Sequence, residues 1–160
     1  MIRVKIKIGS GSAVDSLEAY HFIYLSSDNR LAAPLKEFES TTYPEQAGVN
    51  IFPQTVDDTF DYKIEFLVES GGSLSTANGL IKAFNDSLFS QVDGSDIKEF
   101  KRVTIYNPHK NVMITGIPEP IQEASDFWRD RLGNSSSYAR VEWTIHVDKP
   151  ADCNFNYTES

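Results

Sequence analysis

The chain has 160 residues, the size of one domain, and carries 15 Lys and Arg against 23 Asp and Glu, for a formal net charge of −8. Hydrophobic residues make up 40% of the sequence and aromatic residues 12%, which is enough to bury a core and excludes an intrinsically disordered chain. The acidic balance and the lack of any basic run argue against specific nucleic-acid binding and against binding to anionic membranes, because both need clustered Lys and Arg.

The sequence also lacks the patterns of transmembrane and secreted proteins. Its uninterrupted apolar stretches are far shorter than the roughly 20 residues that span a bilayer. Residues 1–8 alternate charged and apolar side chains, whereas a signal peptide has a charged start followed by an apolar block. Cys153 is the single cysteine, so no intrachain disulfide can form. We therefore expect a protein that is assembled in a reducing cytoplasm.

Strand patterns run along most of the chain, because apolar and polar side chains alternate as they do on the two faces of a strand. In the last of these segments Trp143 lies on the apolar face, which predicts a core position. Residues 107–111, Asn-Pro-His-Lys-Asn, have turn composition and predict a hairpin. Strands are expected at residues 2–8, 19–25, 60–69, 100–106, 112–117 and 138–147, with a short edge strand at 121–124.

Residues 26–59 form a long segment whose prolines argue against a central strand. Three aromatic residues, Phe38, Tyr43 and Phe52, are spaced along it. A segment of this length without regular structure is unusual inside a compact domain and is often functional. Two interpretations stay open: an ordered surface loop held by its own aromatic side chains, or an arm that packs on a neighbouring subunit.

One helix is expected after the strand at 60–69, where the apolar period changes from two to between three and four. Its apolar stripe consists of Ala77, Leu80, Ile81, Phe84 and Leu88, which places the helix over about residues 75–91. A single amphipathic helix is not stable by itself, so it must lay this stripe on a sheet.

The order of strands, one helix and further strands predicts an α+β fold, mainly an antiparallel sheet or sandwich with one helix packed on it. We expect residues 1–148 to form a single β-rich domain and residues 149–160 to form a loose polar C-terminal tail.

Residues 125–137 are mostly polar and predict a loop with three unusual members, Phe127, Trp128 and Arg129. Tryptophan and arginine are enriched at interface hot spots, so this loop is a candidate for contact with a partner. The alternative, that the loop is anchored on its own core, stays open.

Patterns of catalytic or metal-binding residues are not found. The three histidines, His21, His109 and His146, lack zinc-site spacing, and His146 lies on the polar face of a strand, where a solvated side chain is expected. No residue near Cys153 in the sequence would activate its thiol. We therefore expect no catalytic residue, no metal, no cofactor and no enzyme activity. A hydrolase would need residues that meet only in three dimensions, in a concave pocket.

Three blocks carry a resemblance to a known family. The first block consists of residues 22–27 (Phe-Ile-Tyr-Leu-Ser-Ser), then Pro34-Leu35-Lys36, then Tyr43-Pro44-Glu45-Gln46-Ala47-Gly48. The second block is the strand 62–69, which is followed directly by the helix. The third block is the hairpin 103–117 together with residues 140–147, which run into Asp148-Lys149-Pro150. In their order and spacing these blocks resemble the N-terminal domain of siphophage distal tail proteins and related tail adaptors.

The resemblance implies a structural protein of a phage or prophage tail. Such domains form a hexameric ring that joins the tail tube to the baseplate or tail tip, so the implied partners are further copies of the chain and the tail-tube and baseplate proteins, and the implied location is the virion tail. An acidic wall suits a ring through which DNA passes without binding. The candidate assembly interface consists of Phe38, Tyr43, Phe52, Phe127, Trp128 and Arg129. The alternative function is a non-catalytic β-sandwich module that binds carbohydrate or protein.

Overall fold

The computed structural model describes residues 3–36, 40–41, 50–51, 56–70, 74–129 and 137–158. Two α-helices, α1 (Ser16–Tyr20) and α2 (Leu74–Ser87), and a 3-10 helix, η1 (Pro150–Asp152), accompany the strands. The strands are β1 (Lys5–Ile8), β2 (Val14–Asp15), β3 (Phe22–Ser27), β4 (Ser40–Thr41), β5 (Asn50–Ile51), β6 (Phe60–Ser70), β7 (Phe89–Gln91), β8 (Lys98–Phe100), β9 (Val103–Asn107), β10 (Val112–Pro118), β11 (Ser125–Arg129) and β12 (Ser137–Val147).

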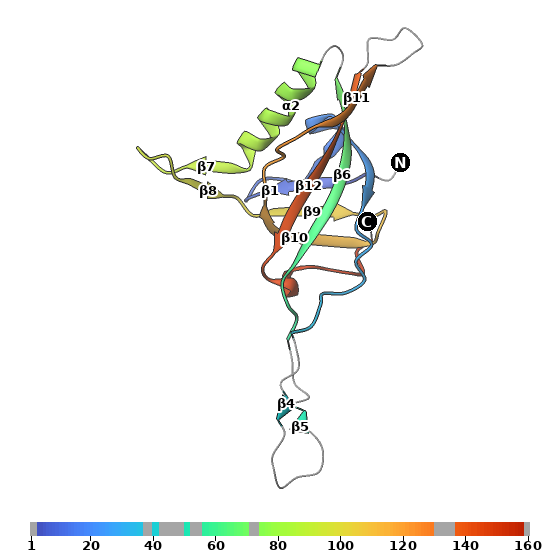
Figure 1. Ribbon diagram of the computed structural model, residues 1–160, viewed down its shortest axis with the longest axis vertical. Helices are drawn as coiled ribbons and strands as arrows, with labels where there is room; N and C mark the ends of the chain where they lie inside the picture. Colours follow the sequence, from blue (N-terminus) through green and yellow to red (C-terminus); the bar gives the residue numbers. More distant parts are fainter. Residues whose placement is uncertain are drawn as a thin grey trace.

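The main sheet has the strand order β2-β1-β9-β10-β12-β6-β3, with β11 paired to β12, and each described pairing is antiparallel. Two further ribbons of two strands each, β4–β5 and β7–β8, stand apart from it. In Figure 1, β1, β9 and β10 run across β6 and β12, and α2 lies to one side of the crossing strands. The α+β prediction, with an antiparallel sheet and one main helix, is confirmed.

The two halves of the sheet are joined at a corner where β10 leaves β9 and pairs with the end of β12. Only Ile117 with His146 and Pro118 with Ile145 are paired there. Gly116 makes this corner possible, since a Cβ at this position would overlap the carbonyl oxygen of His146. A strand that passes from one layer to the other closes an orthogonal sandwich in this way.

The core lies between the crossing layers. Alternate residues of β6 and β12 are buried as their sequence pattern predicts, and Trp143 is fully buried. α2 adds Phe84, whose ring makes edge contacts with those of Phe22 and Trp143 at centroid distances of 4.8 and 5.0 Å. The core contains Val4, Ile6, Phe22, Phe60, Tyr62, Ile64, Phe66, Val68, Ile81, Phe84, Leu88, Val103, Ile105, Val112, Ile114, Ile121, Val141, Trp143, Ile145 and Val147.

The helix predicted at residues 75–91 extends too far, because the observed helix ends four residues earlier. α2 ends at Ser87, whose hydroxyl donates to the carbonyl of Phe84 at 2.6 Å. The apolar stripe ends one residue later at Leu88, and the chain then enters β7, where Phe89 pairs with Phe100 of β8. Residues 89–91 belong to a hairpin because their partners, residues 98–100, lie seven to eleven positions downstream, beyond the three- and four-residue spacing of a helical pattern.

The predicted strand at 19–25 is also partly wrong, because its first residues belong to α1. The Asp15 carboxylate accepts the Leu17 amide at 2.9 Å and begins this helix, and His21 in the left-handed conformation (φ 61°) ends it. Further along the chain, residues 121–124 do not form the predicted edge strand, whereas residues 125–129, predicted as loop, form β11.

The described part of the C-terminal tail returns to the sheet instead of being loose. Asn154 exchanges two backbone hydrogen bonds with Met113, at 2.8 and 2.9 Å. The rings of Phe155 and Tyr157 lie 6.1 Å from Phe60 and 5.6 Å from Tyr106. The tail therefore covers the edge of β10 that β9 leaves open, which protects that edge from pairing with another chain.

Candidate functional site

The residues predicted from the sequence for the assembly interface lie in two regions. Phe38, Tyr43 and Phe52 fall outside the described residues. Phe127, Trp128 and Arg129 lie on β11, which pairs with β12 and changes register between Ser125 and Trp128. β11 is an edge strand rather than the predicted loop, and nothing in its description tests the role of these three side chains.

The segment 26–59 contains paired backbone that its prolines concealed. Leu35 forms a bridge with Asp57, and the Asp58 amide donates to the carbonyl of Pro34 at 2.6 Å. Farther along, Ser40 pairs with Ile51 and Thr41 with Asn50. Both the Leu35–Asp57 bridge and the β4–β5 pairing are antiparallel. β4–β5 lies at the bottom of Figure 1, away from the sheet.

The base of this arm, taken here as residues 31–36 with 56–58, exposes apolar side chains. Leu31 is 79% exposed, Leu35 56% and Val56 60%. Beside the base the Arg30 guanidinium lies 4.5 Å from the centre of the Phe60 ring, where a cation–π contact covers the edge of the core. A two-stranded ribbon with apolar side chains in water is marginally stable at best.

A second projection, the β7–β8 hairpin, follows α2 directly and points away from the sheet (Figure 1). Ile97 and Phe100 are 65% and 58% exposed. Between the hairpin and α2 lies a cavity of about 470 Å³, which we call the α2 groove, and its lining consists of Lys82, Asn85, Asp86, Phe89, Lys98, Phe100 and Pro120. Sequence reasoning missed this hairpin, although the Asp93-Gly94 pair that turns it was a usable signal.

The segment that follows β10, residues 119–124, packs beside α2. Asn85 holds it through two hydrogen bonds, donating to the carbonyl of Ile121 and accepting its amide, both at 2.8 Å. Pro120 lines the α2 groove, and residues 121–124 line an adjoining cavity of about 550 Å³. The position of this segment therefore shapes both hollows.

Charged side chains cover the outer face of β6 and β12. Arg140 donates to Glu65 at 2.6 Å, and Lys63 lies 4.0 Å from Glu142. At the end of the row, His146 contacts two carboxylates, those of Asp61 and Glu119. The prediction of a polar face is correct, but two carboxylates on one histidine were not predictable from the alternation, because Glu119 comes from the chain just after β10, far from His146 in the sequence.

A buried polar cluster ties the layers together elsewhere. The fully buried Asn107 donates to the hydroxyls of Ser27 and Tyr62, at 2.9 and 3.0 Å, and its side-chain oxygen accepts the His109 amide at 3.2 Å. Burial raises the pKa of the Tyr62 hydroxyl. The His109 ring stacks on that of Tyr24 at a centroid distance of 4.4 Å, and His109 itself lies exposed in the turn that follows β9.

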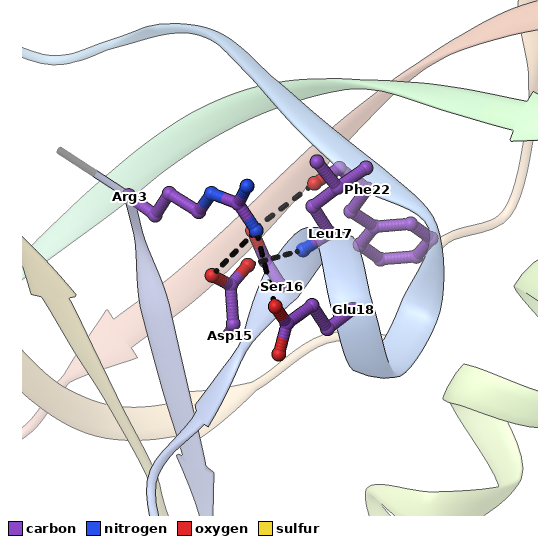
Figure 2. A network of polar contacts seen from close by, with 6 residues as sticks. All are labelled: Arg3, Asp15, Ser16, Leu17, Glu18 and Phe22. Carbon is purple, nitrogen blue, oxygen red and sulfur yellow. Dashed lines mark hydrogen bonds and ion pairs between the residues drawn. The ribbon is translucent and has the colours of Figure 1, made fainter. Parts of the chain in front are cut away.

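A smaller polar network holds the N-terminal strand to α1, as Figure 2 shows. Arg3 donates to Asp15 at 3.1 Å and to Glu18 at 3.4 Å, and the Ser16 hydroxyl donates to the carbonyl of Phe22 at 3.0 Å. The polar groups of this network find their hydrogen-bond partners within the chain itself, which is typical of a structural network.

His146 and Cys153 are the described titratable side chains nearest to catalytic chemistry, and both are constrained by their surroundings. Both ring nitrogens of His146 are engaged by carboxylates, so neither is free to accept a proton from a substrate. Burial raises the pKa of the Cys153 thiol, which makes it a poorer nucleophile at neutral pH. Among the described residues no group of three His, Cys, Asp or Glu could hold a metal ion, and no helix in that part of the chain is long and apolar enough to cross a membrane.

Comparison with known proteins finds similarity among solved structures. No family model matches the chain, and no curated protein has a similar sequence. Among solved structures, the chain is similar to the SPP1 Dit protein, whose crystal structure is described as a paradigm of the hub adsorption apparatus in phages that infect Gram-positive bacteria. The sequences are 16% identical, the TM-score is 0.55, and the match covers 92% of this chain and 50% of that one. The chain thus spans about half the length of the matched protein and shares its fold.

Proposed function

We propose that the chain is a structural protein of a phage or prophage tail, a ring-forming adaptor between the tail tube and the baseplate. The observation that carries this proposal is the fold shared with SPP1 Dit over 92% of the chain. The block order in the sequence supports the same family independently. The net charge of −8 is compatible with DNA passing through the ring, because an acidic wall repels the negatively charged DNA backbone.

Two projections support the ring. The base of the arm, residues 31–36 with 56–58, and the β7–β8 hairpin leave the sheet in different directions in Figure 1, and both carry exposed apolar side chains. Different surfaces that meet head to tail form closed rings when the rotation between subunits closes. In this proposal Phe38, Tyr43 and Phe52 of the arm and Phe127, Trp128 and Arg129 of β11 contribute to contacts between subunits or with the tail-tube and baseplate proteins.

The second candidate function is a non-catalytic binding module. The α2 groove favours it, because aromatic and polar side chains together line a hollow of ligand size. A binding module needs no self-association, so the two candidates are separated by the mass of the protein in solution.

Mass photometry of the full chain over a range of concentrations tests the proposed ring. We expect a discrete species of several copies, and a strict monomer at every concentration would contradict the proposal. Replacing Ile97 and Phe100 with Glu should weaken the assembly by placing charge on exposed apolar positions, while Glu99→Gln, an exposed substitution in the same hairpin, is the matched control.

A further inference from the structure

His146 lies between two carboxylates that come from different parts of the chain. It is on β12, directly opposite Asp61 of β6 in the strand register. Its Nδ1 is 2.5 Å from Asp61 Oδ1, and its Nε2 is 2.7 Å from Glu119 Oε1. Glu119 is the residue that immediately follows β10. One imidazole ring thus joins β6, β12 and the chain that leaves the corner.

Only the protonated ring satisfies both contacts. A neutral imidazole has one N–H, whereas an ionised carboxylate offers only acceptors. After loss of the proton, one carboxylate oxygen would face a ring nitrogen that also carries a lone pair, at hydrogen-bond distance. The hydrogen bond to Asp61, followed by that to Glu119, raises the pKa of His146 above its ordinary value.

Other charged groups near the ring have partners of their own. Asp148, the residue that follows β12, accepts two hydrogen bonds of 2.9 Å from Arg102. Lys63, the next outward-facing residue of β6 after Asp61, lies near Glu142. An open hollow of about 450 Å³ reaches His146 and Asp61 and gives water access to the ring.

Glu119 connects this cluster to the packing around α2. Its amide donates to the carbonyl of Thr144 at 3.0 Å, and its carbonyl accepts the indole N–H of the buried Trp143 at 2.8 Å. Two residues later the chain reaches Ile121, which Asn85 of α2 holds by two hydrogen bonds. Glu119 is therefore joined by the backbone and by these hydrogen bonds to the segment that lines the α2 groove.

We propose that Asp61, His146 and Glu119 form a protonation-dependent latch, which holds residues 119–124 against the sheet and loosens them when His146 loses its proton. Because Pro120 lines the α2 groove, the latch sets the shape of that groove as a function of pH. The inference depends on the geometry of these three residues and not on the proposed tail function.

Amide hydrogen exchange of residues 119–124, corrected for the intrinsic pH dependence of exchange, tests the latch in the full chain. In the wild type we expect protection to fall about two- to fivefold as the pH rises from about 6 to about 9, the size expected for an exposed charge pair. His146→Gln has no titratable group and should show no such step.

Glu119→Gln is the sharper variant, because its amide can donate to the neutral Nε2 and so keeps the contact without the charge. Its pH step should shrink while the protein stays folded. Glu123→Gln, an exposed carboxylate in the same segment, is the matched control and should keep the wild-type step.

A wild-type segment without a pH step, or an equal step in Glu119→Gln, would overturn the proposal. If His146→Gln does not fold, Glu119→Gln and the NMR titration of His146 in the wild type decide the question. In that titration an apparent pKa that does not fall on Glu119→Gln substitution would also contradict the latch.

Discussion

The paired strands β6 and β12 differ in their packing from the two projecting ribbons. Along the described parts of β6 and β12 every second residue is buried, and these residues belong mostly to the hydrophobic core. The β7–β8 hairpin has no buried residue, and the base of the arm exposes its leucines and its valine. The comparison suggests that β6 and β12 supply the stability and the ribbons supply surface for contact.

The largest expected effect comes from the core side of this comparison. Phe84→Ala removes a ring that packs against those of Tyr20, Phe22 and Trp143. We expect a loss of about 3–5 kcal/mol in the free energy of unfolding. Urea unfolding measures this, and a loss below about 1 kcal/mol would contradict the described packing of α2.

The buried Asn107 cluster is the next test. Asn107→Ala leaves the Tyr62 hydroxyl without the amide that donates to it in a fully buried place. We expect a cost of about 1–3 kcal/mol. The double variant with Tyr62→Phe should cost less than the sum of the two single variants, because it removes both partners. Strict additivity would show that the two groups do not interact.

The corner between the two layers can be broken with a single methyl group. Gly116→Ala should destabilise the fold by about 1–3 kcal/mol, because the new Cβ overlaps the carbonyl of His146 and also meets Ile145. Gly79→Ala on α2 is a matched control, since a Cβ there meets nothing within 4 Å and Ala favours helix. Thermal unfolding of both variants should show opposite shifts in Tm.

A smaller effect is expected from pH. The folded protein raises the pKa of His146 above the value of about 6.5 in an unfolded chain. The charge pairs therefore stabilise the fold fully below pH 6.5, and this contribution is lost as the pH rises through the folded pKa. Because His146 is 42% exposed, we expect less than about 1 kcal/mol. The difference in unfolding free energy between wild type and His146→Gln should shrink over that range.

The smallest effect on stability is expected in the hairpin. Phe100→Ser removes an aromatic ring that is 58% exposed and contacts Phe89 from one side. We expect a change within about 0.5 kcal/mol in unfolding free energy together with a loss of self-association. A large loss of stability would mean that the hairpin belongs to the core.

The same comparison explains which parts of the fold were predictable from the sequence. β6, β12 and the β9–β10 hairpin were predicted because one face of each packs on a core and the alternation records it. The β7–β8 hairpin was misassigned to the end of a helix, because its exposed residues carry no such alternation. Asp61 was not predicted beside His146 because the alternation does not give the register between β6 and β12. Glu119 was not predicted there because it reaches His146 only through the corner at Gly116.

The most direct test of the central claim is electron microscopy of the purified full chain at micromolar concentration. The account predicts closed rings of identical copies with a central opening, and their loss in the variant with Glu at Ile97 and Phe100. Uniform monomeric particles of both proteins, confirmed by mass photometry of the same samples, would contradict it.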